Sequence, residues 1–590
     1  MMVNLLSSLW CLGAMAVSAN PLVADHTATA GGPSVHLLSA AEASLHRSRA
    51  GTRLFGTLLG ADGVSLDFAQ VHLQSYAGDD VLASTTVDGN GGWSLVADTS
   101  GVFMLWFSAP GHRGERVGLL LTGDEPAIQI DARLARHQLR KAPFEVTLIG
   151  EFNEFRSDRG AIPFRPRPDG RLAAEVAVTG DSLAYQLLGV ALTGPIEGPG
   201  ADRFSYDGSG GYRSVVDAGG PFVTVAFDPA DMSSGSGHGE VRFAADSTAS
   251  GRFGAYTREL FRRVDAYFET RARAADAGAS TTEMRAIYEH YDPVPDARLV
   301  GSALSRESDP ALRDLMRVTY MAAPIKTDPA TARASLDEVP PGAAAWEVEP
   351  QGLSEALSAS GDPERSREYA LSVLASPASA SRTGALVRST ALGWLLEDAL
   401  SRGAGAELAA YHAWLVGEYP DSKAAGKAAA LYAPDRRIQP GSPIPAFEVR
   451  AMGDPSTTYS PLSLSGQVVM LDFWATWCGP CITEMPFLHR AYDEFSSDGF
   501  TILSLSFDLS PEDVENFRGE GDWPMPWLHT FVEEGADSEL AADLDVVNIP
   551  RAILIGRDGT ILATNEALRG ERLRETLARA LSTGSGGGNR

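Results

Sequence analysis

Two of the three cysteines in this 590-residue chain are separated by two residues, in the run Cys478-Gly479-Pro480-Cys481. Residues 468–474 before them are almost continuously apolar, which predicts a strand buried on both faces. Residues 482–495 have helical spacing, so Cys478 lies at a helix N-terminus, where unpaired amides and the helix dipole stabilise a thiolate. Cys481 follows one turn later, within disulfide reach. We therefore expect thiol-disulfide exchange, with Cys478 attacking and Cys481 resolving the mixed disulfide.

Residues 446–581 resemble the TlpA-like thioredoxin family, which comprises bacterial periplasmic or membrane-anchored reductases. The matching motifs are Leu-Asp-Phe-Trp-Ala-Thr-Trp-Cys-Gly-Pro-Cys at 471–481, Glu-Met-Pro at 484–486, and Asn-Ile-Pro at 548–550 before an apolar strand at 552–555. The resemblance implies an α/β thioredoxin fold at residues 436–582. Gly and Pro between the cysteines favour a reductase over an oxidase. No separate cofactor is implied, because the Cys478–Cys481 disulfide is itself the redox group.

The resemblance also implies roles for residues around the cysteines. Asp472 matches the buried acid of thioredoxins and Glu484 the acid of the TlpA-like branch, so both are candidates for moving the proton of the resolving thiol. For Glu484 the alternative is a solvated helix residue. Pro550 is expected to be cis and to face the disulfide, with the backbone of Ile549 free to pair with a substrate strand. The expected substrate-binding residues are Trp477, Gly479, Pro480, Ile549, Pro550 and Arg551.

Arg551 departs from the family pattern, which usually has Thr at this position. It is expected either to place a cation beside the substrate groove, which would favour acidic substrates, or to be a solvated side chain. The family pattern continues with a tight turn at 557–560 and an amphipathic helix at 571–581. The insert at 510–539 resembles the extra helix and strand of this branch.

Charge and the N-terminal segment bear on partners and location. The chain has 49 Lys and Arg against 76 Asp and Glu, a net charge of −27, so nucleic acid is not an expected partner. The first charged residue is Asp25, and residues 1–19 are expected to be a signal peptide ending in Val-Ser-Ala, or an uncleaved anchor. A basic residue usually precedes the apolar run of a signal peptide, and here none does. The periplasm or cell envelope is the expected location, with a protein disulfide as substrate and an upstream, membrane-embedded thiol donor.

The expected fold class is multidomain: two N-terminal β-sandwiches, an all-α helical region, and the C-terminal α/β thioredoxin fold. After a linker at 20–50, residues 51–140 resemble a carboxypeptidase-regulatory-like β-sandwich, with an Asp-Gly turn at 88–92 and with Ala-Pro-Gly-His at 109–112. His112 is expected to be a turn residue. Residues 143–250 resemble an early-set sandwich of the glycogen-binding kind. This range contains no Trp for stacking on a sugar, so a structural role is favoured there.

Residues 252–433 show helical spacing, for example Tyr256, Leu260, Val264 and Phe268, and resemble a tetratricopeptide-like array without a strict repeat. Further helices are expected near 282–291, 311–322, 364–374, 383–400, 404–419 and 422–432. Four prolines at 434–445 indicate a domain boundary, and residues 583–590 are expected to be a flexible tail.

Three other functions compete with disulfide reduction. A zinc site would need four ligands, and the chain has no second Cys-x-x-Cys pair. A peroxiredoxin-like peroxidase has Thr three residues before its reactive cysteine, where this chain has Ala475. A cell-envelope binding or scaffold protein with an accessory redox domain remains open, because about three quarters of the chain lies outside that domain.

Overall fold

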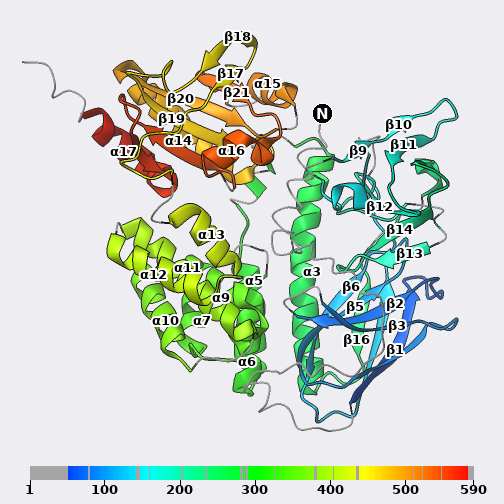
Figure 1. Ribbon diagram of the computed structural model, residues 1–590. Coiled ribbons are helices and arrows are strands. Elements are labelled where there is room, and N and C mark those ends of the chain that lie inside the picture. The colour runs from blue at the N-terminus through cyan, green and yellow to red at the C-terminus, as the bar shows by residue number, and fades with distance from the viewer. Residues whose placement is uncertain are drawn as a thin grey trace, which may run out of the picture.

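The computed structural model shows two β-rich regions, a helical region and a C-terminal α/β domain (Figure 1). None of the helices in the described part of the chain is both long and apolar enough to cross a membrane. The segments predicted as signal peptide, linker and tail, at 1–19, 20–50 and 583–590, lie outside the described residues. The structure describes residues 51–76, 80–140, 146–157, 160–198, 201, 203–232, 234–235, 237–279, 283–284, 286–287, 290–323, 325, 327–377, 382–402, 404–433, 437–508, 510–520, 523–546 and 548–582.

The first β-rich region consists of two four-stranded sheets that share one hydrophobic core. The sheet orders are β16-β7-β1-β4 and β3-β2-β5-β6. Asp88 accepts hydrogen bonds from the backbone N–H groups of Asn90 and Gly92, which forms the predicted turn before β4. The strands are β1 (Thr52–Gly60), β2 (Gln70–Ser75), β3 (Val81–Thr86), β4 (Gly92–Ala97), β5 (Gly101–Ser108), β6 (Glu115–Leu121), β7 (Ala127–Leu134) and β16 (Glu240–Phe243).

The second β-rich region has a five-stranded sheet, β13-β14-β12-β8-β9, and a three-stranded sheet, β10-β11-β15, around a core of their own. The strand β16 falls in the range 143–250 but pairs with β7 of the first region, so the chain returns to the first region before the helices begin. The strands are β8 (Thr147–Gly150), β9 (Ile162–Pro163), β10 (Arg165–Pro166), β11 (Leu172–Ala177), β12 (Ser182–Leu188), β13 (Arg203–Tyr206), β14 (Tyr212–Asp217) and β15 (Phe222–Phe227).

Helices follow one another from residue 249 to residue 432, as the spacing predicts, and no strand interrupts them among the described residues. The segment 282–291 is only partly described. Four helices that the sequence did not mark, α5 and α7 to α9, complete the array. The helices are α3 (Ala249–Asp276), α5 (Val294–Arg306), α6 (Pro310–Met321), α7 (Pro329–Glu338), α8 (Ala345–Val348), α9 (Pro350–Ala359), α10 (Pro363–Ala375), α11 (Arg382–Arg402), α12 (Gly405–Glu418) and α13 (Lys423–Tyr432).

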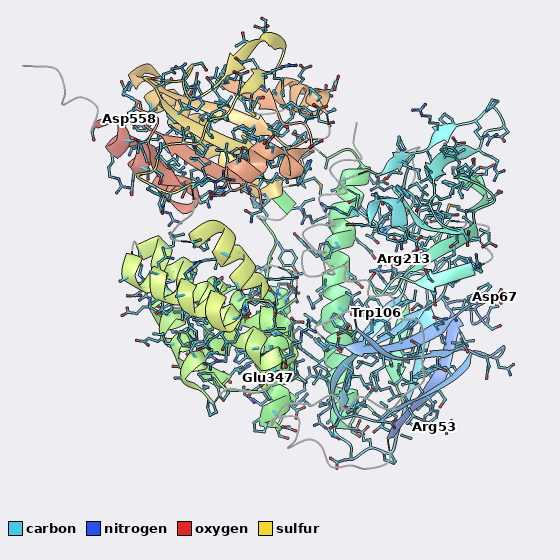
Figure 2. The ribbon with its side chains drawn as sticks, in the orientation of Figure 1. Arg53, Asp67, Trp106, Arg213, Glu347 and Asp558 are labelled. Atoms are coloured by element: carbon cyan, nitrogen blue, oxygen red, sulfur yellow. A yellow bond between two sulfur atoms is a disulfide. The ribbon has the colours of Figure 1, made fainter. Side chains whose placement is uncertain are left out.

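The long helix α3 joins the helical array to the first β-rich region. It runs beside β5 and β6, where Trp106 is labelled in Figure 2. One face of α3 packs in the helical core with Phe253 and Tyr256. The side chain of Thr257 is fully buried, and its Oγ1 accepts a hydrogen bond of 2.9 Å from the backbone N–H of Gly118 on β6. A sheet amide is thus satisfied by a helix side chain rather than by another strand.

Thr257→Val should therefore weaken the contact between α3 and β6. Valine keeps the shape but leaves the Gly118 N–H buried without its acceptor, at a cost of about 1–2 kcal/mol. The measurement is the opening free energy of the β6 amides by hydrogen exchange. Thr270→Val is the matched control, because Thr270 is exposed on the same helix and its hydroxyl donates only to Ala266 O. Equal effects of the two substitutions would contradict the expectation.

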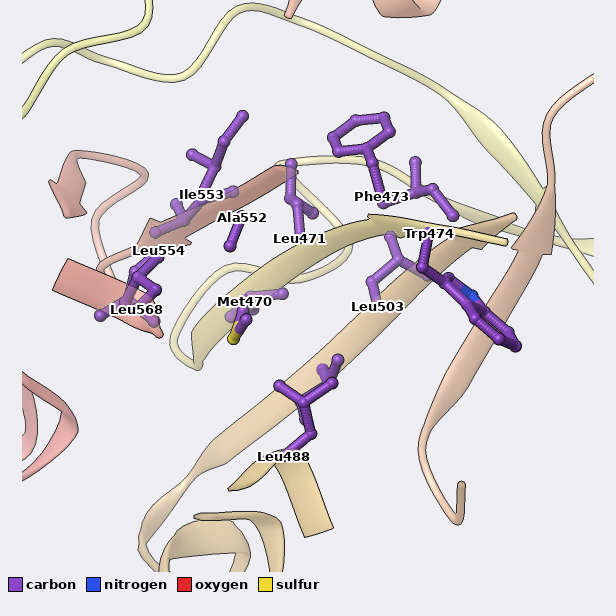
Figure 3. Close-up of a cluster of buried hydrophobic side chains, with 14 of the residues drawn as sticks. Met470, Leu471, Phe473, Trp474, Leu488, Leu503, Ala552, Ile553, Leu554 and Leu568 are labelled. Atoms are coloured by element: carbon purple, nitrogen blue, oxygen red, sulfur yellow. The ribbon is translucent and has the colours of Figure 1, made fainter. Parts of the chain in front are cut away.

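The C-terminal domain is built on a five-stranded sheet in the order β21-β20-β19-β22-β23. The strand β19 (Val468–Trp474) is parallel to β20 (Phe500–Ser506) and antiparallel to β22 (Arg551–Ile555), and all three are buried along their whole length. Figure 3 shows the apolar side chains that β19, β20 and β22 contribute to this core. The remaining strands are β17 (Val449–Ala451), β18 (Asp454–Tyr459), β21 (Leu528–Phe531) and β23 (Ile561–Thr564).

Helices flank this sheet and include the two that the sequence predicted after the cysteines and at the C-terminus (Figure 1). The insert at 510–539 contains a helix and a strand, as expected. The helices are α14 (Gly479–Phe495), α15 (Pro511–Glu520), α16 (Glu539–Asp543) and α17 (Glu571–Ser582).

Candidate functional site: a disulfide at a helix N-terminus

The strand β19 ends at Trp474, and the next residues carry the chain to the start of α14. Cys478 is the N-cap of α14, and its Sγ accepts a hydrogen bond of 3.2 Å from the backbone N–H of Cys481. The two cysteines form a disulfide. An amide that already points at Sγ in the disulfide would also stabilise negative charge there after reduction.

Both cysteines are buried, next to an exposed corner of the chain. Cys478 is 5% exposed and Cys481 is 2% exposed, while Gly479 and Pro480 between them are exposed. Trp477 is partly buried and packs against the domain core. The exposed Gly-Pro corner thus lies directly beside the two buried cysteines.

The loop before β22 contains a cis peptide bond between Ile549 and Pro550, as the resemblance implied. Both residues are half-buried. The carbonyl oxygen of Pro550 accepts a hydrogen bond from the guanidinium of Arg569, at the end of the short 3-10 helix η5 (Asn565–Leu568). This loop is thus tied to the segment that leads into α17.

Asp472 lies in the middle of β19, between Ser504 of β20 and Ala552 of β22. Ser504 Oγ donates a hydrogen bond of 3.2 Å to Asp472 Oδ2, and Trp527 Nε1 donates one of 2.9 Å to Ser504 Oγ. Burial raises the pKa of Asp472 to about 6, a nearby Glu484 carboxylate acts in the same direction, and the charge of Arg569 and the Ser504 hydrogen bond oppose the rise. A carboxyl group with this pKa can exchange a proton near neutral pH.

Glu484 is half-buried on α14, and its Oε2 accepts a hydrogen bond of 2.9 Å from the backbone N–H of Gly570. It is therefore not the solvated helix residue of the alternative interpretation. Arg569 binds the Pro550 carbonyl, and its charge acts on Asp472. The next residue, Gly570, binds Glu484, so two consecutive residues link the cis-proline loop to both acids.

The prediction that Arg551 is a solvated side chain is wrong, because Arg551 is 1% exposed. It is the first residue of β22 and pairs with Phe473 of the central strand β19. All five positions of β22 are buried, so both faces of the strand point into the protein at this end. The alternative of a cation that selects acidic substrates has no support from this buried position.

Asp508 is a further buried acid that the sequence did not mark. Its carboxylate accepts hydrogen bonds from the backbone N–H of Thr476 at 3.0 Å, from Thr476 Oγ1 at 2.6 Å and from Ser506 Oγ at 2.7 Å. Burial raises the pKa of Asp508, and these hydrogen bonds oppose the rise. Thr476 stands two residues before Cys478, so Asp508 holds in place the backbone segment that leads to the disulfide. The sequence did contain a signal for Asp508, because it follows a buried strand that is parallel to β19. The carboxyl ends of parallel strands meet at one edge of a sheet, so Asp508 could have been expected near the end of β19.

Comparisons with known proteins identify relatives of the C-terminal domain. A family model described as thioredoxin-like matches residues 466–561. The thiol-disulfide oxidoreductase ResA of Bacillus thuringiensis subsp. konkukian is 31% identical over 112 residues, which cover 19% of this chain and 60% of that protein. A ResA protein of Bacillus cereus is 29% identical over 147 residues, which cover 25% of this chain and 79% of that protein. The thiol:disulfide interchange protein DsbE of Pseudomonas aeruginosa is 27% identical over 121 residues, covering 20% and 63%.

A solved structure, the thioredoxin domain of a thiol-disulfide oxidoreductase from Bacteroides vulgatus, is 27% identical. It covers 24% of this chain and 97% of its own, with a TM-score of 0.22. This chain spans 60% of the length of the ResA protein from Bacillus thuringiensis. All of these matches fall within the C-terminal part of the chain. The predicted resemblance is confirmed: the C-terminal domain is thioredoxin-like and is related to ResA-type and DsbE-type oxidoreductases.

Proposed function

We propose that the chain is an exported thiol-disulfide oxidoreductase that reduces protein disulfides. The observation that carries the proposal is the Cys478–Cys481 disulfide at the head of α14, with the amide of Cys481 directed at the sulfur of Cys478. The names of the ResA and DsbE relatives support the same chemistry.

The proposed reaction uses the reduced pair. The thiolate of Cys478 attacks one sulfur of a substrate disulfide, which forms a mixed disulfide and releases the other substrate sulfur as a thiolate. Cys481 then loses its proton and attacks the Cys478 sulfur. The second substrate thiolate leaves, and the Cys478–Cys481 disulfide forms again. Two electrons pass from the pair to the substrate, so no other cofactor takes part, and an upstream thiol donor must reduce the pair for the next cycle.

The surrounding residues have defined tasks in this proposal. Asp472, with its pKa near neutrality, accepts the proton of Cys481, and Glu484 sets the charge around Asp472. The substrate segment contacts the exposed Gly479-Pro480 corner and Trp477. It also pairs with the backbone of Ile549 beside Pro550, in the manner of an added strand.

The N-terminal sequence supports the proposed location and electron supply. Residues 1–24 contain no charged side chain and are largely apolar, and an apolar segment is the feature that export signals and membrane anchors share. Outside the cytoplasm the cellular glutathione and thioredoxin pools cannot reduce the pair directly. We therefore propose a membrane-embedded thiol donor that brings electrons across the bilayer.

Insulin reduction tests the activity, and redox equilibration tests its direction. The reduced chain should precipitate insulin with dithiothreitol as donor, faster than dithiothreitol alone. In glutathione buffers the pair should equilibrate nearer to thioredoxin, about −270 mV, than to the oxidant DsbA, about −120 mV. No acceleration of insulin reduction would overturn the activity. A potential near that of DsbA would overturn the direction and leave the exchange chemistry standing.

A further inference from the structure

A cavity of about 350 Å³ lies where the two β-rich regions meet α3. Its walls come from β5, from residues 113–116 at the start of β6, from residues 137–140 after β7, from residues 188–195 and 207–211, and from α3. None of the residues that line it belongs to the C-terminal domain, so it is separate from the disulfide. Small-molecule sites commonly have volumes of about 300–1,000 Å³ and form where domains meet.

The wall of this cavity is rich in arginine, although the whole chain carries a net charge of −27. The carboxylates that line it are Asp207 and Asp265. His137 also lines the cavity but adds no charge at neutral pH, because burial lowers its pKa to about 3. Cations therefore outnumber anions two to one. The cations are Arg113, Arg116, Arg140 and Arg271.

Both carboxylates are already committed to the protein. Asp265 pairs with Arg113 at 2.9 Å and with Arg116 at 3.1 Å. Asp207 accepts hydrogen bonds from the backbone N–H groups of Ser209 and Gly211, at 2.8 and 3.0 Å. These contacts hold both side chains in place, and the charge of Asp265 is already shared between two arginines.

Arg271, on α3, is one of the four arginines of the wall. Among the described residues, no carboxylate lies within 4.0 Å of its guanidinium. Its Nη1 donates a hydrogen bond of 3.2 Å to the hydroxyl of Tyr267, and its Nε is buried without a hydrogen-bond acceptor. A buried donor of this kind, on a charged group, favours an anion that can complete its bonds.

Apolar side chains also line the cavity. Trp106, Leu188, Leu192 and Phe268 line the same cavity, and the guanidinium of Arg116 lies 5.3 Å from the centroid of the Trp106 ring. A ligand here meets aromatic and aliphatic side chains together with the guanidinium groups of the wall.

We propose that this cavity binds a small organic carboxylate with an aromatic or aliphatic body. Arg271 pairs with the carboxylate through its planar fork of N–H donors, and the body lies against Trp106 and Phe268. The proposal does not depend on the redox function of the C-terminal domain.

Calorimetric titration of the full chain with cinnamate and with cinnamyl alcohol tests this proposal, because the two probes share a body and differ in charge. Cinnamate should bind at least ~10-fold more tightly than the alcohol. Arg271→Gln should weaken cinnamate at least ~10-fold and leave the alcohol unchanged. Arg262→Gln is the matched control, since Arg262 is exposed on the same helix and pairs with Glu259 outside the cavity.

Equal affinity for the two probes would overturn the proposal, as would no binding of cinnamate up to about 10 mM. An unchanged cinnamate affinity in Arg271→Gln, with the circular dichroism of the wild type, would overturn it as well.

Ala272→Leu gives a second test should Arg271→Gln fail to fold. Ala272 lines the cavity and is buried, so the larger side chain should fill the space and abolish cinnamate binding. Retained binding in that variant would place the ligand elsewhere and overturn the proposal.

Discussion

A Cys478→Ser chain should lose insulin reduction by at least ~1,000-fold, because a hydroxyl cannot replace the thiolate as nucleophile at neutral pH. The substitution removes one sulfur and leaves the backbone of α14 unchanged. All variants are best made on a Cys11→Ser background, so that Cys478 and Cys481 are the only thiols. The measurement is the rate of insulin precipitation at fixed dithiothreitol.

The matched Cys481→Ala variant should behave differently. It keeps the attacking sulfur at the helix N-terminus and loses the resolving one, so it should form a mixed disulfide with substrate and stop there. Non-reducing electrophoresis then shows a covalent adduct that Cys478→Ser does not form. An adduct in Cys478→Ser, or the absence of one in Cys481→Ala, would contradict the assignment of the attacking and resolving cysteines.

Asp472→Asn should stabilise the C-terminal domain at pH 7 by up to ~3 kcal/mol. The folded pKa of about 6 lies above the ordinary 3.8, so the folded state holds its proton more tightly than the unfolded state does. Stability therefore falls as pH rises from about 4 to 6, and above pH 6 the full cost of a buried carboxylate remains. Asparagine has the same shape and no charge. The measurement is the opening free energy of the β19 amides by hydrogen exchange.

The pH dependence separates this effect from a general change in packing. At about pH 4.5 the benefit of Asp472→Asn should shrink to about 1 kcal/mol, because the wild-type carboxyl is then largely protonated in the folded state. Asp493→Asn, at an exposed position of α14, is the control and should show no such trend. A benefit that does not change with pH would contradict the raised pKa. In the proposed reaction the same variant should also slow turnover, since the acceptor for the Cys481 proton is gone.

The local features of the C-terminal domain were predictable from the sequence because they rest on short-range patterns. The apolar run at 468–474 is the central strand, and the helix begins at the cysteines as the spacing predicts. Asp472 is buried on that strand and Ile549-Pro550 is cis. These positions follow from burial periodicity and from motifs whose members lie close together in the chain.

Other features depend on contacts between distant segments. Arg551 looked exposed because Arg usually is, but the strand it begins is covered on both faces. The hydrogen bonds of Asp508 to Thr476, and of Arg569 to Pro550, join residues between 19 and 32 positions apart. The pairing of β16 with β7 crosses more than one hundred residues. No local periodicity encodes such partners. Whether the β-rich regions belong to the named sandwich families stays a prediction.

The position of α3 determines where the protein can be divided into independently folding fragments. A fragment ending near residue 250, where the strands stop, would keep β6 but lose Thr257, the acceptor of the Gly118 N–H. It would also uncover the apolar surface around Val102 and Leu120, which packs against the helical core. A fragment extended to residue 276 keeps the acceptor but exposes Tyr256, whose hydroxyl donates a hydrogen bond to the carbonyl of Met316 in the helical array. Neither cut leaves two self-sufficient pieces, so the minimal autonomous unit on the N-terminal side comprises the strands and the helical array together.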